Sequence, residues 1–266
     1  MLKYLRLLLL PFNVVYALVV YVRNLFFDWG IFQSTSFDMP IICVGNLAVG
    51  GSGKTPTTEY VVRLLSEYKV AILSRGYGRK TKGFVLADDA ATAETIGDEP
   101  LQYYRKFKNV TVAVCEDRVK GIQKLKDEHE VILLDDAYQH RKVKAGFNVL
   151  LFEFSKITRF QMLMPAGNLR EPFSGVKRAQ AVLITKSPSK ISNEIKAEIL
   201  NKLIFRIAVG GSYFFEMAKL RAFKILFNQL SKEYGMDEIP YIFAETSQRN
   251  KAIADNNIFF MLIFEV

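Results

Sequence analysis

The sequence feature that most constrains the fold is a glycine-rich segment between an apolar run and a helical pattern. The apolar run MPIICVGN leads into GNLAVGGSGKTP, which covers residues 45–56. Glycines let backbone N–H groups converge on phosphate oxygens, and the start of a helix adds positive potential. Lys54 would reach the β and γ phosphates, and the Thr55 hydroxyl would bind Mg²⁺. The segment predicts a phosphate-binding loop made of Ala48, Val49, Gly50, Gly51, Ser52, Gly53, Lys54 and Thr55, in which Ala48 stands where a leading glycine is usual.

The order of the apolar runs predicts an α/β fold. After residue 38, short apolar runs alternate with helical stretches, which is typical of a mostly parallel, buried sheet. In the helical stretch 54–68, Val61, Leu64, Leu65 and Tyr68 would share one face. A doubly wound, P-loop NTPase-like domain follows, with its ligand site at the carboxyl ends of the strands. The six expected strands are MPIICVGN, KVAILSRG, VTVAVCED, VILLDDA, NVLLFEF and AVLITKS, and a second expected helix covers residues 118–128.

An acidic pair ends one of these runs. Asp135 and Asp136 follow the apolar residues 131–134, and Asp135 is placed as the carboxylate with which phosphate-loop NTPases hold Mg²⁺. Apolar runs that end in aspartate are common, so this motif gains its meaning from the glycine-rich loop. Gln139 and His140 follow at the same edge, and His140 is either a site residue or a histidine that caps a loop.

Two further motifs indicate which nucleotide is bound. Guanine-specific members of this class read the base with an Asn/Thr-Lys-x-Asp motif, whereas Thr185 and Lys186 are followed here by Ser187 and Pro188. Membrane-cycling partition ATPases carry an extra lysine early in a Gly-Gly loop, where this chain has Val49. ATP is therefore preferred over GTP, and the partition class is disfavoured.

The composition favours anionic partners and a reducing compartment. With 36 Lys and Arg against 27 Asp and Glu, the net charge is +9, which suits nucleotide phosphates, nucleic acid or lipid head groups. The charges are spread along the chain without a basic recognition motif, which disfavours nucleic acid. Two cysteines and two histidines cannot build a Cys/His metal cluster. We interpret Cys43 and Cys115 as buried thiols of a protein on the cytoplasmic side.

The first 36 residues predict a membrane-associated helix. Between Arg6 and Arg23 the one strongly polar residue is Asn13, so the apolar length falls slightly short of the ~20 residues of a spanning helix. No small-residue cleavage site follows, which disfavours a signal peptide. Flanking basic residues and interfacial aromatics suit an anchor that spans the membrane or lies in one leaflet. The expected interfacial aromatics are Tyr16, Tyr21 and Trp29.

Five motifs in order resemble a known family. They are GNLAVGGSGKTP (45–56), SRGYGR (74–79), GDEP (97–100), LLDDAYQH (133–140) and PAGNLREP (165–172). With the N-terminal apolar segment, they resemble the tetraacyldisaccharide 4'-kinase family up to about residue 205. The resemblance implies transfer of the ATP γ-phosphoryl group to the 4'-hydroxyl of tetraacyldisaccharide 1-phosphate, giving lipid IVA in lipid A biosynthesis. It further implies Mg²⁺, the lipid A precursor and membrane lipids as partners without a protein partner, and the cytoplasmic face of the bacterial inner membrane as location.

The resemblance also implies roles for single residues. Asp98 matches the family's proposed base, which takes the proton of the sugar hydroxyl, and Lys54 and Arg170 would act on the phosphoryl group. The implied metal ligands are Thr55, Asp135 and Glu99. Contacts to ATP or to the 1-phosphate of the lipid fall to Arg75, Arg79, Arg118, Gln139, His140 and Asn168. From the residues alone, the arginines are also explained as solvated loop charges, and GDEP as an acidic helix start.

Two departures from the family pattern stand out. Ala137 and Tyr138 replace a usual Gly-Phe pair, which is tolerable if the φ angle there is negative. The family's second lobe contains an Asp-His-His motif, whereas His140 is the last histidine here. We therefore expect a truncated, frameshifted or diverged region beyond about residue 205. The expected organisation is a membrane anchor at 1–36, a P-loop kinase domain at 37–205 and a divergent remainder at 206–266.

Two other functions fit the same sequence. A membrane-attached ATPase switch would hydrolyse ATP to control a protein partner without phosphorylating lipid. A catalytically impaired copy of the kinase would bind ATP without transferring phosphate to any acceptor.

Overall fold

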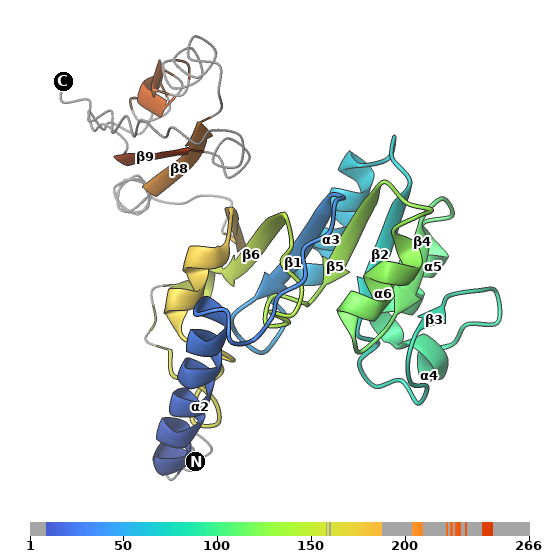
Figure 1. Ribbon diagram of the computed structural model, residues 1–266, viewed down its shortest axis with the longest axis horizontal. Helices are drawn as coiled ribbons and strands as arrows, with labels where there is room; N and C mark the ends of the chain where they lie inside the picture. Colours follow the sequence, from blue (N-terminus) through green and yellow to red (C-terminus); the bar gives the residue numbers. More distant parts are fainter. Residues whose placement is uncertain are drawn as a thin grey trace. The chain divides into compact units, whose positions relative to one another are not determined.

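The chain divides into two compact units, Met1–Ser187 and Pro188–Val266. The structure is a computed structural model, shown in Figure 1. It describes residues 9–157, 159, 161–187, 204–209, 222, 224–225, 227–229, 232 and 241–246.

The first unit is built on a seven-stranded sheet with strand order β3-β4-β2-β5-β1-β6-β7. Six strands are parallel, and the six apolar runs of the sequence are confirmed as these strands. The short β3 joins at one edge, antiparallel to β4. The strands are β1 (Ile41–Asn46), β2 (Val70–Ser74), β3 (Val85–Leu86), β4 (Thr111–Val114), β5 (Val131–Asp135), β6 (Phe147–Glu153) and β7 (Ala181–Thr185).

Helices cover both faces of the sheet, which confirms the doubly wound arrangement. On one face, α3 and α5 pack against the side chains of Ile72 and Leu133. On the other face, α6 packs against Leu73 and Ile132. The central strands β2 and β5 are buried along their whole length, as the continuous apolar runs indicated. The helices are α3 (Lys54–Leu64), α4 (Ala93–Ile96), α5 (Asp98–Lys106), α6 (Arg118–Leu125), α7 (Phe154–Ile157) and the 3-10 helix η2 (Phe173–Arg178).

The expected apolar face of α3 is confirmed in part. Val61 and Leu65 pack against the core, whereas Leu64 is 63% exposed. The helix ends at Leu64, so Tyr68 lies beyond it, and Thr58 and Val62 are buried instead. Thr58 and Val62 are four residues apart and share the face that packs on the sheet. On this face the Thr58 hydroxyl donates a hydrogen bond to Asp135 Oδ1 at 3.4 Å.

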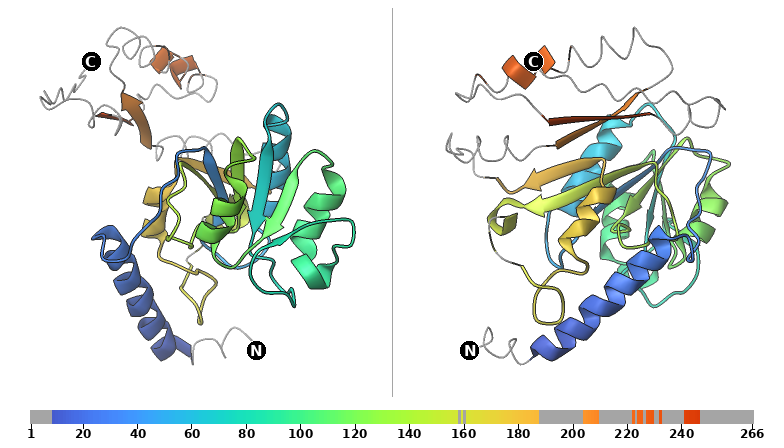
Figure 2. Two further views of the ribbon diagram at one scale, coloured as in Figure 1. Left: turned by 45° about the vertical axis from the view of Figure 1, so that its right-hand side comes forward. Right: turned by 60° about the vertical axis from the view of Figure 1, so that its left-hand side comes forward.

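The N-terminal helix α2 (Leu10–Asp28) has a proline in its first turn, where a missing N–H costs nothing. Within the described part of the chain, it is the one helix long and apolar enough to cross a membrane, by length and composition alone. It runs alongside the segment 163–170 (Figure 2). The Tyr16 hydroxyl donates to the Arg170 carbonyl at 2.8 Å, so this expected interfacial aromatic also contacts the α/β domain. Tyr21 and Trp29 are exposed.

The φ angle expected for Ala137 is confirmed. Among the described non-glycine residues, positive φ angles occur at Asp136 (48°) and Lys186 (54°), so the Ala137 backbone has no need of glycine. The neighbouring Tyr138 is buried, and its hydroxyl donates to the Gly175 carbonyl at 2.7 Å.

In the second unit, β8 (Ile204–Val209) and β9 (Tyr241–Thr246) form a parallel pair. Most of the region 206–266, for which we expected divergence, lies outside the described residues.

Candidate active site

The glycine-rich loop joins β1 to α3 and is held from both sides. The Asn46 side chain donates to Ser52 Oγ at 2.7 Å, and the Thr185 hydroxyl donates to the Ser52 carbonyl at 2.8 Å. Gly50 and Gly53 have φ angles of 114° and 82°, which residues other than glycine rarely adopt. Gly53 also precedes the first turn of α3, so backbone N–H groups and the helix dipole meet at this loop. The geometry is that of a phosphate-binding loop.

Asp136 lies between the two cations that we expected to act on phosphate. Its carboxylate is 3.6 Å from Lys54 Nζ and accepts hydrogen bonds from Arg170 Nη1 at 3.1 and 3.0 Å. Its φ angle of 48° is a strained conformation of the kind found at functional sites. The sequence analysis assigned a function to Asp135 and none to Asp136. The position of Asp136 directly after a buried strand could have indicated that it faces the site.

The expected metal ligands lie next to this loop. Thr55 Oγ1 donates to Glu99 Oε1 at 3.4 Å, and Asp135 accepts from Thr58 on the same helix. Asp135 is buried, and its Oδ2 has no hydrogen-bond partner. Burial, followed by the nearby charges of Glu99 and Asp136, raises the pKa of Asp135 to about 7. A buried carboxylate with an unpartnered oxygen and too little compensating charge fits a cation.

The protein alone supplies few ligands for that cation. Among the described residues, no group of three or more His, Cys, Asp or Glu side chains is arranged to hold a metal ion by itself. Mg²⁺ is usually bound by one or two carboxylates and completes its shell with water and substrate phosphates.

Asp135→Asn is expected to stabilise the nucleotide-free, metal-free protein at pH 8. A folded-state pKa of about 7, above the ordinary 3.8, means that the folded state binds the proton more tightly than the unfolded chain does. The wild type therefore loses up to about 4 kcal/mol of stability as the pH rises from 4 to 7. The amide carries no charge, so we expect a Tm about 5 °C or more above wild type at pH 8.

The same comparison at pH 5 is the internal control, because Asp135 is then protonated in the folded wild type. Scanning calorimetry at both pH values, without Mg²⁺ and nucleotide, would measure the difference. A variant that melts below wild type at pH 8 would contradict the assignment of a strained, buried charge.

Asp98 is placed at the exposed start of α5. Gly97 precedes it with a φ angle of 93°, and a Cβ there would lie 2.9 Å from the Tyr77 carbonyl, so the turn requires glycine. At the other end of the helix, Glu59 of α3 pairs with Lys106 at 2.5 Å and accepts from Gln102 at 3.0 Å. A cavity of about 410 Å³ runs along this face of α5, lined by Asp98, Leu101, Gln102, Arg105 and Lys106.

Arg79 and Arg118, two of the four expected arginines, are not solvated loop charges. The Arg79 side chain is 2% exposed and donates to Glu116 Oε1 and the Gly83 carbonyl, both at 2.6 Å. Arg118 is buried and donates to the Glu116 carbonyl at 2.9 Å. Burial, and after it the nearby charge of Arg75, lowers the pKa of Arg118. Arg75 is exposed beside them, so the structure gathers positive charge beyond the ends of β2 and β4.

The remaining expected contacts separate into two groups. Gln139 Nε2 donates to the Asn46 carbonyl at 2.7 Å, and the Asn168 carbonyl accepts from the Val49 N–H at 2.8 Å, so both flank the phosphate-binding loop. His140 lies further along the 133–140 motif, and its Nε2 is buried without a partner. Burial, and after it the charge of Arg118, lowers the pKa of His140 to about 4, so its ring is neutral at pH 7.

Two lysines near the loop were missed by the sequence analysis. A Cβ on Gly50 would lie 3.8 Å from Lys156 Nζ, and one on Gly51 would lie 3.9 Å from Lys186 Nζ. Both lysines pair with Glu153 at the end of β6. Lys186 belongs to the Thr-Lys-Ser-Pro segment 185–188, which the sequence analysis considered only as a guanine-binding motif and rejected.

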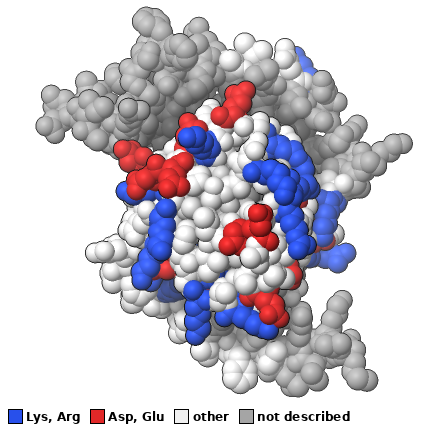
Figure 3. Space-filling model, turned by 90° about the vertical axis from the view of Figure 1, so that its right-hand side faces the viewer, with Lys and Arg blue, Asp and Glu red and all other residues white. Residues whose placement is uncertain are grey.

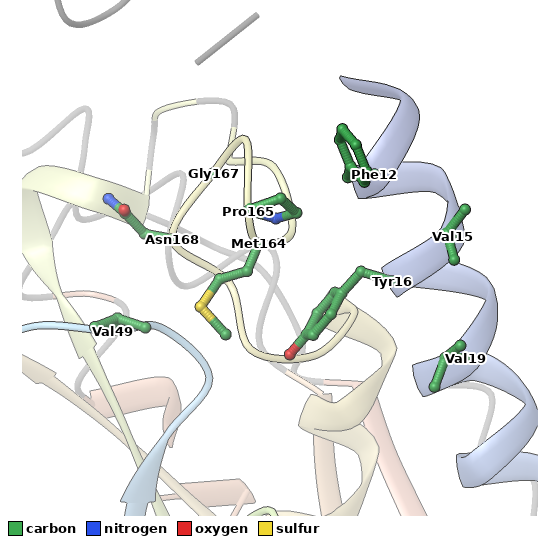
Figure 4. A pocket seen from close by; sticks show the side chains of 9 residues that line it. All are labelled: Phe12, Val15, Tyr16, Val19, Val49, Met164, Pro165, Gly167 and Asn168. Atoms are coloured by element: carbon green, nitrogen blue, oxygen red, sulfur yellow. The ribbon is translucent and has the colours of Figure 1, made fainter. Parts of the chain in front are cut away.

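An apolar cavity of about 750 Å³ opens beside the loop. Figure 4 shows the Phe12 and Tyr16 side chains of α2 directed toward the turn that contains Met164 and Pro165. Val49 of the phosphate-binding loop closes the cavity from a third direction. The lining residues are Phe12, Val15, Tyr16, Val19, Val49, Met164, Pro165, Gly167 and Asn168.

The charged residues are mixed on the face that carries α4 to α6. Figure 3 shows basic side chains in several separate groups, with acidic groups among them. The described residues on this face therefore form no continuous basic surface.

Comparisons with known proteins identify the family of the chain. A family model described as tetraacyldisaccharide-1-P 4'-kinase matches residues 5–226. A tetraacyldisaccharide 4'-kinase of Flavobacterium johnsoniae is 54% identical over 203 residues, which cover 75% of this chain and 60% of the relative. One of Porphyromonas gingivalis is 40% identical over 256 residues, covering 94% of this chain and 69% of the relative.

A solved structure is also similar. The "apo" form of LpxK from Aquifex aeolicus in complex with ATP has a TM-score of 0.65 and 29% identity, covering 96% of this chain and 86% of that chain. The similarity extends past residue 205, further than the motifs alone indicated. The chain spans about 60% of the length of the Flavobacterium relative. On the matched residues and the shared fold, the chain belongs to the tetraacyldisaccharide-1-P 4'-kinase family.

Proposed function

We propose that the protein transfers the γ-phosphoryl group of ATP to the 4'-hydroxyl of tetraacyldisaccharide 1-phosphate, which gives lipid IVA. The observation that carries the proposal is the juxtaposition of a phosphate-binding loop and an apolar cavity that share Val49. A phosphoryl donor and an acylated acceptor would thus meet at one place. The ATP of the Aquifex aeolicus structure and the names of the relatives support the same pair of substrates.

The chain's own residues would act mainly by positioning and charge. The loop N–H groups would bind the phosphates, and Lys54 and Arg170, both held by Asp136, would face the transferred group. Asp98, exposed at the start of α5, would accept the proton of the 4'-hydroxyl as it attacks phosphorus. The buried arginines Arg79 and Arg118 would add positive potential for a phosphate group.

Thr55, Asp135 and Glu99 would hold Mg²⁺. The ion would neutralise charge on the phosphate oxygens. The unpartnered Asp135 Oδ2 supports this assignment.

We place the protein at the cytoplasmic face of the bacterial inner membrane, with α2 lying in the interface. Val14, Leu18 and other apolar side chains of α2 are exposed by about 60% or more. Polar contacts bind the helix to the α/β domain from Asn13 near its start to Asp28 at its end. A spanning orientation would draw the contacting polar loops into hydrocarbon, which is costly. An interfacial helix keeps them in water and directs the acyl chains of the acceptor toward the cavity.

The test is transfer of label from [γ-³²P]ATP to tetraacyldisaccharide 1-phosphate in detergent micelles with Mg²⁺. We expect labelled lipid that depends on both the acceptor and Mg²⁺. ATP hydrolysis without labelled lipid would instead support an ATPase switch. ATP binding without turnover would show an impaired copy of the kinase.

A further inference from the structure

Helix α2 carries polar side chains that reach into the domain below it. Tyr16 and Arg23 are seven residues, or about two turns, apart and therefore lie on the same face of the helix. Each donates a hydrogen bond to a main-chain carbonyl of a segment that contributes to the nucleotide site. A membrane anchor needs only apolar contacts with lipid. These partly buried hydrogen bonds instead connect α2 to the α/β domain.

One series of hydrogen bonds runs from Arg23 to the phosphate-binding loop. Arg23 Nη2 donates to the Gln139 carbonyl at 2.7 Å, and Gln139 Nε2 donates to the Asn46 carbonyl at 2.7 Å. The Asn46 side chain then donates to Ser52 Oγ, also at 2.7 Å. Every link is at least partly buried, so water does not compete freely for these groups.

The middle of this series is fixed by a buried carboxylate. Glu171 is 1% exposed, and its Oε1 lies 3.5 Å from Gln139 Nε2 and 2.7 Å from Arg178 Nη2. Gln139 is therefore held at both its carbonyl and its amide. A displacement of Arg23 would be passed on to Asn46 rather than absorbed by rotation of Gln139.

A second series leads from Tyr16 to the cations of the site. The Tyr16 hydroxyl donates to the Arg170 carbonyl at 2.8 Å. The Arg170 guanidinium binds Asp136, whose carboxylate lies 3.6 Å from Lys54 Nζ. Two contacts of one helix face thus end on the loop itself and on its lysine.

We propose that Arg23 and Tyr16 are positioning residues, through which the docking of α2 sets the geometry of the phosphate-binding loop and hence its affinity for nucleotide. The proposal rests on the proposed function only in taking ATP as the ligand of this loop. It assigns α2 a part in nucleotide binding in addition to its part at the membrane.

The test measures the Kd of a fluorescent ATP analogue, in detergent, for the full chain and its variants. Arg23→Met is expected to weaken binding about three- to tenfold, and Arg23→Lys, which keeps one donor, to recover part of the loss. The matched control is Asp28→Asn, which removes the ion pair of α2 with Arg141 and leaves every hydrogen bond of both series in place. It should leave the Kd unchanged. Because binding is measured without lipid, failure of the kinase reaction would not affect the result.

A double-mutant cycle separates positioning from general loosening of the helix. If Arg23 acts through Gln139, the losses caused by Arg23→Met and Gln139→Leu will not add, and the double variant will bind about as weakly as the worse single one. Additive losses, or equal losses from Arg23→Met and Asp28→Asn, would overturn the proposal. Should Arg23→Met fail to fold, as judged by its thermal transition, Tyr16→Phe decides alone, with an unchanged Kd overturning the proposal.

Discussion

Asp98→Asn is expected to lower the rate of label transfer to tetraacyldisaccharide 1-phosphate by about 10²- to 10⁴-fold. Asparagine keeps the size and the turn at Gly97 but cannot accept the proton of the attacking hydroxyl. Because Asp98 is exposed at the start of α5, outside the phosphate-binding loop, the Kd for ATP should change by less than about twofold. Single-turnover assays beside direct ATP binding would separate the two quantities.

The matched control for Asp98→Asn is Asp127→Asn. The Asp127 side chain is 83% exposed and pairs with its neighbour Lys126 at 3.8 Å, so its loss should leave the rate unchanged. A fully active Asp98→Asn enzyme would remove Asp98 from the reaction. An equal loss of ATP affinity would show instead that Asp98 serves nucleotide binding.

Lys54→Met is expected to lower kcat/KM for ATP by about 10²- to 10³-fold. The Lys54 side chain is 11% exposed and its ammonium group faces Asp136, so it is the cation most shielded from water at the loop. Methionine keeps the apolar length and leaves Asp136 with Arg170 as its remaining cation. The negative charge of Asp136 would then repel the phosphates that Lys54 attracts.

Lys186→Met provides the control at the same loop. Lys186 is 54% exposed and pairs with Glu153 at 3.7 Å, so solvent screens its charge and we expect a loss of less than about fivefold. Comparable losses in the two variants would mean that the loop responds to overall positive charge. In that case the specific placement of Lys54 would be unsupported.

The strands and the loop could be predicted from sequence because each depends on local residue types. Central parallel strands are buried on both faces, so the runs at β2 and β5 are apolar throughout. The loop between β1 and α3 needs glycines for its backbone angles and lysine for its charge, and both residue types can be identified in the sequence.

Features that depend on contacts distant in sequence could not be predicted in this way. The buried face of α3 includes Thr58, whose bond to Asp135 the apolar pattern of residues 61–68 could not indicate. Tyr16 is an aromatic residue of the kind found at membrane interfaces. Its hydrogen bond to Arg170, 154 residues away, is visible only in the structure. Asp136 gains its importance from Arg170, which approaches from another segment of the chain.

The two buried cysteines provide a built-in reporter of unfolding. Cys43 and Cys115 are 2% and 3% exposed, and burial raises the pKa of Cys43 to about 12. The thiolate is the form that attacks alkylating reagents, and both sulfurs are buried, so neither reacts while the sheet stays closed. The rate of alkylation therefore counts opening events of the α/β domain directly, in detergent or on vesicles where calorimetry is difficult. Each stability comparison can be repeated at the membrane surface without adding a label to the chain.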